Sequence, residues 1–134
     1  MLLQIDHHSG QPIYRQVIEQ VRRQIVAGQL RQGEQLPSVR DLASQLRVNP
    51  MTVSKAYSLL EKEGLLDRRR GVGLFVAELG RDKASRTRDD MLEAALTRAV
   101  VTAIQLGISQ ERARDMLTRL YQKYDSRMRR QEDE

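Results

Sequence analysis

The sequence contains no cysteine and no tryptophan, and aromatic residues make up only 4% of its 134 positions. Without cysteine the chain has no disulfide, no thiolate ligand for a metal and no cysteine nucleophile. With so few aromatic rings, the core has to be built mainly from Leu, Val, Ile, Ala and Met. The lack of cysteine agrees with a reducing cytosol, and we expect a cytoplasmic protein.

Long apolar runs are also missing. No stretch approaches the ~18 consecutive apolar residues of a membrane helix, and the opening MLLQIDHHSG lacks the basic and apolar regions of a signal peptide. We therefore expect neither a membrane protein nor a secreted one. Charged residues reach 31%, and the net charge of +5 favours an anionic partner, with nucleic acid first.

No pattern typical of catalysis or metal binding is visible. His7 and His8 are the only histidines, and adjacent side chains point apart on a helix or a strand, which makes a poor metal pair. The segment Gly71-Val72-Gly73 is half of a dinucleotide-binding glycine motif and has no βαβ unit around it. Asp89 and Asp90 fall at an expected helix start, where carboxylates favour the helix dipole. We expect no enzyme, no metal and no tightly held cofactor.

The first part of the chain predicts a well-punctuated helix. Pro12 suits the first helical position, an apolar stripe at helical spacing runs on to Ile25, and Gly28 suits a left-handed residue after the last turn. Residues 33–37 have the composition of a loop. A short strand is also expected over Leu3 to Ile5.

Two more helices follow with very little chain between them. Ser38 and Asp41 form a capping box for a short helix that ends near Arg47. Asn49 caps the next helix, Pro50 takes its first position, and Gly64 closes it. Helices this close in sequence pack at a steep angle, as in a helix-turn-helix. Two short apolar runs around residues 71–73 then predict a β-hairpin, which completes a winged helix-turn-helix.

After Leu79 the pattern becomes purely helical. Thr87 and Asp90 suggest another capping box, Gly107 stops that helix, and Ser109 caps the last one. The expected fold is mainly α with a small β-hairpin. Its predicted parts are a winged helix-turn-helix domain at 1–79, a linker at 80–86, and a helical hairpin with a charged tail at 87–134.

The third expected helix has the pattern of a DNA-reading helix. Its apolar face must be buried, which leaves small polar and basic residues on the opposite face. Small hydroxyl side chains allow a helix to approach base edges in the major groove, chiefly from its N-terminal end. Taken singly, such residues are often ordinary surface. Together with the basic hairpin they predict these DNA contacts: Ser38, Arg40, Arg47, Asn49, Met51, Thr52, Ser54, Lys55, Ser58, Arg69, Arg70, Gly71 and Gly73.

The motifs in this region resemble the DNA-binding domain of the GntR family of bacterial regulators. They are Pro-Ile-Tyr at 12–14, LPSVRDLA at 36–43, VNPMTVSKAY at 48–57, EGL at 63–65, RGVG at 70–73 and Phe-Val at 75–76. The resemblance covers about residues 11–77. It implies operator contacts by the Leu-Pro-Ser-x-Arg arginine, by the polar residues of the recognition helix and by the glycine wing tip, here Arg40, Thr52, Ser54, Lys55 and Gly71.

The remaining ~55 residues are similar to the YtrA subfamily, whose short two-helix tail dimerises and whose members are typically repressors. An apolar stripe on each helix exceeds what a lone hairpin can cover, so we expect a homodimer that binds an inverted-repeat operator. The expected interface consists of Leu92, Leu96, Ala99, Ala103, Leu117, Leu120, Tyr121 and Tyr124. The sequence leaves two alternatives open, a winged-helix module for protein assembly and regulation by a small-molecule effector.

Overall fold

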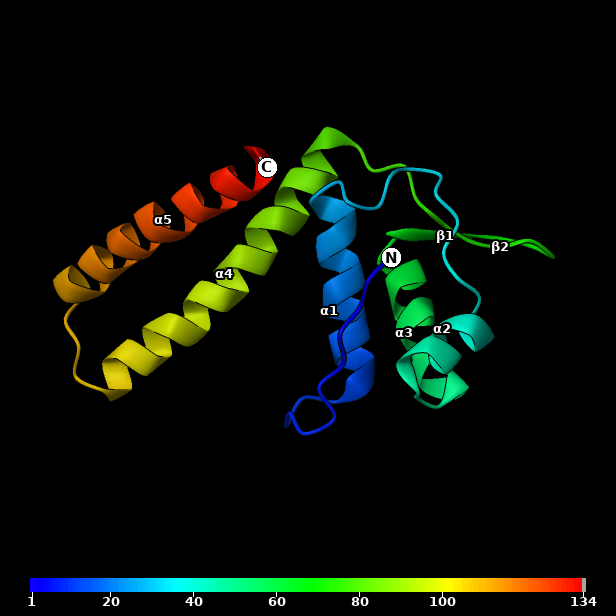
Figure 1. Cartoon of the computed structure of the whole chain (residues 1–134), viewed down its shortest axis with the longest axis horizontal. Coiled ribbons are helices and arrows are strands. Elements are labelled where there is room, and N and C mark those ends of the chain that lie inside the picture. Colours follow the sequence, from blue (N-terminus) through cyan, green and yellow to red (C-terminus); the bar gives the residue numbers. More distant parts are fainter. Residues whose placement is uncertain (134) are drawn as a thin grey trace. The chain divides into compact units, whose positions relative to one another are not determined.

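The helix boundaries follow the punctuation of the sequence. In the computed structural model, which describes residues 1–133, α1 spans Ile13–Val26, α2 Val39–Leu46 and α3 Pro50–Lys62 (Figure 1). Pro12 lies just before the first turn of α1, and Gly28, with φ of +81°, follows its last turn. The oxygen of Ser38 accepts from the Asp41 N–H at 3.0 Å, so the expected cap of α2 is confirmed.

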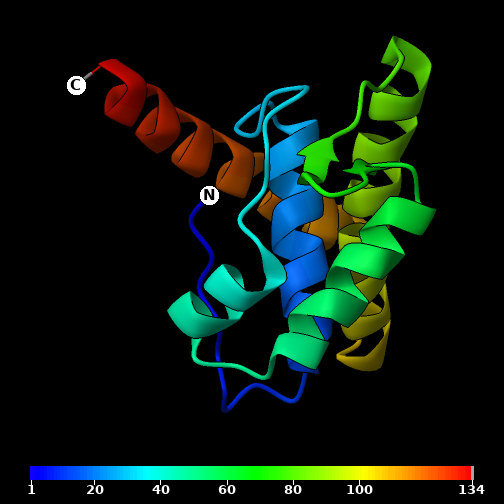
Figure 2. The same cartoon turned by 90° about the vertical axis from the view of Figure 1, so that its right-hand side faces the viewer.

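The three helices share one core, and α3 lies at its centre. It packs against α1, α2 and β1, and α1 and α3 lie side by side in both views (Figures 1 and 2). The fully buried members of this core include Val17 of α1, Leu42 of α2, and Tyr57 and Leu60 of α3. Burying one such side chain contributes about 1.5–3 kcal/mol, so this packing fixes the orientation of α3.

The hairpin consists of β1 (Leu66–Arg69) and β2 (Gly73–Val76), which pair antiparallel with Arg69 opposite Gly73. A second neighbour on the other edge of β2 was not expected. The Gly33 N–H donates to the Val76 carbonyl and the Leu36 N–H to the Leu74 carbonyl, both at 2.9 Å. The loop between α1 and α2 therefore extends the small sheet, and β2 lies at its middle.

The expected strand over Leu3 to Ile5 is not formed, because its backbone has side chains rather than a strand as partners. Three glutamines one turn apart on α1 bond alternate residues of the extended segment, Gln24 with Leu2, Gln20 with Gln4 and Gln16 with Asp6. Four helical residues rise ~6 Å, close to the ~6.6 Å that two extended residues span. This match of spacings lets the side-chain amides replace a partner strand.

The second part of the chain contains α4 (Arg81–Gln105) and α5 (Gln110–Asp133). Contacts divide the chain into a unit of Met1–Arg88 and one that begins at Asp89, within α4. The linker expected at 80–86 is helical from Arg81 onward. Gly80 is its only strong helix breaker and lies just before α4, where its carbonyl accepts from the Ala84 N–H at 3.0 Å. The functional division between 1–79 and 87–134 stays a prediction.

The expected capping box at Thr87 was wrong. Thr87 lies inside α4, and its hydroxyl donates to the Lys83 carbonyl one turn earlier at 2.9 Å. The Lys83 ammonium donates in turn to the Glu63 carbonyl after α3 at 2.8 Å. The cap at Ser109 is confirmed, since its oxygen accepts from the Arg112 N–H at 3.2 Å. No helix in the described part of the chain is long and apolar enough to cross a membrane.

Candidate nucleic-acid interface

The recognition helix α3 buries one face and leaves the other open, as expected. Val53, Ala56, Tyr57 and Leu60 are buried, whereas the Met51 side chain is 77% exposed at the N-terminal end. The Asn49 side-chain oxygen accepts from the Met51 N–H at 2.9 Å and caps the helix. Of the other predicted contacts on α3, Ser54 and Lys55 are exposed, and Thr52 and Ser58 are half-buried.

The helix before α3 is held to it by a buried tyrosine. The Tyr57 hydroxyl donates to the Pro37 carbonyl at 2.9 Å, immediately before the Ser38 cap. Burial raises the pKa of Tyr57 well above its usual range, so the hydroxyl remains a donor at neutral pH. Arg40 and Arg47 are both exposed. Arg47, at φ +56°, forms the left-handed turn that ends α2 and leads to α3.

Lys55 has a partner that helical spacing on α3 could not reveal. Its ammonium nitrogen lies 3.9 Å from the centre of the Tyr14 ring on α1. The Arg15 Nε donates to the Tyr14 hydroxyl at 3.3 Å, and this hydrogen bond is the main cause of a lowered Tyr14 pKa, followed by the charges of Arg15 and Lys55. The aromatic ring therefore holds one positive charge at the edge of the exposed face of α3.

The three arginines of the hairpin are not equivalent. The Arg68 guanidinium pairs with the Glu61 carboxylate at 3.2 Å, and that of Arg69 lies 4.1 Å from the centre of the Phe75 ring. Arg70 and Gly71 are exposed at the tip, where Gly71 has φ of +73° and Gly73 of +142°. Arg70 has no ion pair with the side chains described, those of residues 1–131, and is the one of the three best placed for an external anion.

The predicted interface residues of α4 and α5 are uncovered. α4 has no buried residue, and α4 with α5 is not among the pairs of elements that pack extensively. Leu92, Leu96, Ala99, Leu117, Leu120, Tyr121 and Tyr124 are exposed, and Ala103 is half-buried. Six further exposed apolar residues were not in the predicted interface, namely Val100, Val101, Ile104, Leu106, Met116 and Met128. Of these, Val100, Val101 and Ile104 lie outside the single stripe expected on α4.

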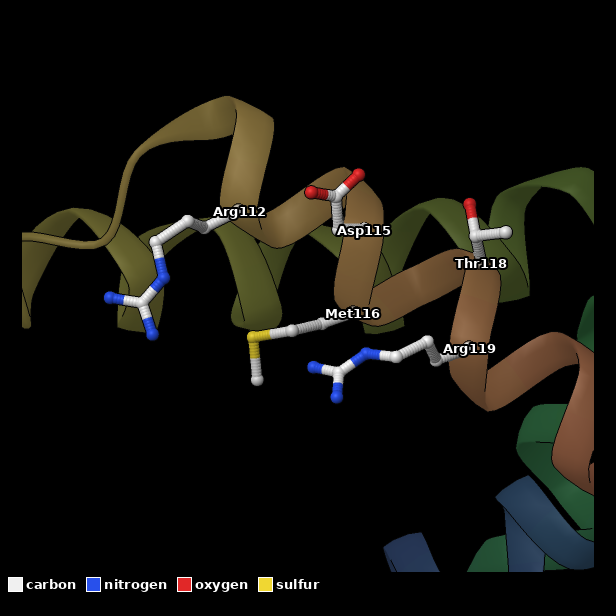
Figure 3. A pocket seen from close by; sticks show the side chains of 5 residues that line it. All are labelled: Arg112, Asp115, Met116, Thr118 and Arg119. Carbon is white, nitrogen blue, oxygen red and sulfur yellow. The ribbon is translucent and has the colours of Figure 1, made fainter.

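A concavity of about 500 Å³ is lined by residues of α5 alone. Figure 3 shows that Arg112, Met116 and Arg119 project to one side of the helix, whereas Asp115 and Thr118 project to the other. A ligand site normally surrounds its ligand with several elements. Because a single helix lines this concavity, it is an open stretch of surface and not an enclosed cavity.

This arrangement defines a winged helix-turn-helix protein. It has three packed helices, of which the third is capped and exposes one face, followed by a basic hairpin. Residues 13–76 match the model of the gntR family of bacterial regulatory proteins. The chain is 34% identical over 116 residues to the HTH-type transcriptional repressor YtrA of Bacillus subtilis (strain 168), covering 87% of this chain and 89% of that protein. The chain therefore belongs to the GntR family, and its similarity to YtrA spans both parts of the molecule.

Solved structures agree with this assignment. A GntR family transcriptional regulator from Listeria monocytogenes has a TM-score of 0.75 at 29% identity, over 86% of this chain and 98% of that one. The DNA-binding domain of AraR, solved in complex with operator ORX1, has a TM-score of 0.51 at 29% identity, over 57% of this chain and 96% of that one. The family and its relatives carry the names of transcription regulators, not of enzymes.

Proposed function

We propose that this protein is a homodimeric transcription repressor that binds an inverted-repeat operator. The observation that carries the proposal is the division of α3 into a fully buried face and an open one. Its four apolar residues fix the helix in the core, and Met51, Ser54 and Lys55 are exposed on the open face. The relative YtrA is named a repressor, and operator binding implies that the protein works in the bacterial cytoplasm.

The proposed contacts fall into two kinds. Met51, Ser54 and Thr52, near the start of α3, are placed to meet base edges in the major groove. Positive charge for the phosphates is supplied by Arg40, Lys55, Arg69 and Arg70, and such contacts set register and orientation on the duplex. The alternative of a protein-assembly module is less well supported, because an assembly surface is depleted in charge at its centre.

Dimerisation is proposed from the uncovered apolar residues of α4 and α5. Leu120 is 48% exposed and Ile104 is 73% exposed, and neither helix is covered by the other within the chain. Large exposed apolar side chains in this number mark an interaction site, and a second copy with two-fold symmetry is its commonest occupant. Two winged helix-turn-helix domains related by such an axis require two half-sites in inverted orientation.

The reading surface is tested by selecting bound duplexes from a random library and measuring their affinity for variants. Arg40→Ala is expected to weaken binding by ~1–3 kcal/mol and to leave thermal unfolding unchanged, since the side chain is exposed. Gln29→Ala, an exposed glutamine in the loop after α1, serves as the matched control. Failure of the wild-type chain to enrich any sequence would refute the proposed function.

The dimer is tested separately by sedimentation. Leu96→Asp and Leu120→Asp are expected to produce monomers at micromolar concentration, because each places a charge inside the proposed interface. Gln122→Asp is the control, since residue 122 lies on the side of α5 opposite Leu120 and is exposed. Loss of the dimer should also reduce operator affinity ~10²–10⁴-fold through lost avidity. If both variants remain dimeric, the interface lies elsewhere.

A further inference from the structure

The loop between α1 and α2 holds the tip of the wing through one side chain, that of Gln35. Its Nε2 donates to the Val72 carbonyl at 3.0 Å. The Gln35 backbone is already fixed opposite Phe75 by an antiparallel bridge. The side chain therefore reaches the turn from a rigid base at the edge of the sheet, and it joins two segments far apart in the sequence.

The absence of a side chain at Gly73 leaves the space that this bond needs. A Cβ at Gly73 would lie 2.9 Å from the Gln35 Nε2, and its φ of +142° is a conformation that residues with side chains rarely adopt. In contrast, a Cβ at Gly71 would meet nothing within 4 Å. The two glycines thus have different roles, since Gly71 shapes an open tip and Gly73 accommodates the amide of Gln35.

The carbonyl that Gln35 binds belongs to the turn that presents Arg70. Val72 is anchored on both sides, because its N–H donates to the Arg69 carbonyl at 3.0 Å and its C=O accepts from Gln35. The two residues between Arg69 and Val72 are Arg70 and Gly71, both exposed. A turn held at this point presents its arginine in a restricted set of directions.

We propose that Gln35 is a positioning residue for the wing, which fixes the direction of Arg70 toward DNA without contacting the DNA itself. The inference rests on the DNA-binding function proposed above. Its physical basis is preorganisation. A turn that is already ordered loses less conformational entropy when Arg70 contacts a phosphate. The free energy of DNA binding is therefore more favourable.

The test uses the full-length chain and a duplex that the wild-type chain has selected from random DNA. Gln35→Met keeps the length of the side chain and removes its donor. Gln32→Met, in the same loop, is the matched control, since the Gln32 amide reaches the Leu79 carbonyl and not the wing. Loss of one hydrogen bond is expected to weaken operator binding about three- to tenfold in Gln35→Met and to leave the control unchanged.

The decisive measurement is a double-mutant cycle with Arg70→Ala. If Gln35 acts through Arg70, adding Gln35→Met to Arg70→Ala should change the affinity by less than about twofold. The proposal is overturned if Gln35→Met lowers the operator affinity equally in the wild-type and Arg70→Ala backgrounds. It is also overturned if Gln35→Met binds the operator like the wild type while Arg70→Ala binds it more weakly. Neither result contradicts the proposed DNA-binding function. A melting temperature lowered by many degrees in Gln35→Met also overturns it, by assigning the residue to stability. If the wild-type chain selects no duplex, both proposals fail.

Discussion

The ammonium nitrogen of Lys55 lies 3.9 Å from the centre of the Tyr14 ring. This contact connects the first turn of α1 with the exposed face of α3. The contact joins residues 41 positions apart in the sequence. It restricts a flexible lysine side chain that would otherwise sample many rotamers. The position of this charge beside the proposed DNA surface therefore depends on an aromatic residue outside the helix-turn-helix.

Replacing Tyr14 with Leu is expected to weaken operator binding modestly. An exposed cation–π contact contributes ~0.5–1 kcal/mol, and its loss leaves Lys55 free to point away from the DNA. Tyr14→Phe retains the ring and is the control, with affinity close to that of the wild type. Fluorescence anisotropy with a labelled operator measures both. Equal weakening by the two variants would show that the hydroxyl, not the ring, matters.

The salt dependence of binding is expected to distinguish Arg70 from Arg68. Each phosphate contact adds ~0.9 to the slope of log K against log salt concentration. Arg70→Ala should lower the slope by about this amount, because the residue is exposed and has no ion pair with the side chains of residues 1–131. Arg68→Ala should change it less, since its charge is compensated by Glu61 at 3.2 Å. Titrations from low to moderate salt give the slopes, and identical changes would contradict this assignment.

Tyr57→Phe is expected to destabilise the reader domain by about 1 kcal/mol, because it leaves the Pro37 carbonyl without its donor. Urea unfolding measures the difference. The raised pKa of Tyr57 fixes the pH dependence. Above about pH 10 the unfolded chain ionises this tyrosine while the folded chain does not, so the wild type loses stability with rising pH. The difference in unfolding free energy between the wild type and Tyr57→Phe should therefore become smaller above that pH. A difference that stays constant with pH would contradict the prediction.

Gln16 is the buried member of the glutamine row on α1. Its side chain binds both backbone groups of Asp6 at 2.9 Å and donates to the Gln11 carbonyl at 3.0 Å. Gln16→Leu leaves these groups without partners and is expected to cost about 1–3 kcal/mol of unfolding free energy. Gln20→Leu, at a more exposed pair, should cost less. Hydrogen exchange at the Asp6 amide offers a local check, since it should become faster only in Gln16→Leu.

Much of the reader domain was predictable from the sequence. Ser38 and Asn49 predict where helices begin, because each caps a helix through a short-range hydrogen bond of its side chain. The spacing of the apolar residues Val53, Ala56 and Leu60 predicts the buried face of α3. Such signals are local, since each depends on residues within a turn or two. The GntR motifs 36–43 and 48–57 added the expected roles. These features follow from the amino-acid sequence alone because the atoms involved are neighbours along the chain.

The tertiary structure alone decided which partner each surface residue has. Three consecutive arginines look alike in the sequence, yet Arg68 pairs with Glu61, Arg69 stacks on Phe75 and Arg70 is left exposed. Likewise, Gln35 reaches Val72 across the sheet, and residues 81–86 are helical because nothing after Gly80 breaks the turn. Contacts between distant segments depend on how the whole core packs, and no local pattern of residues encodes them.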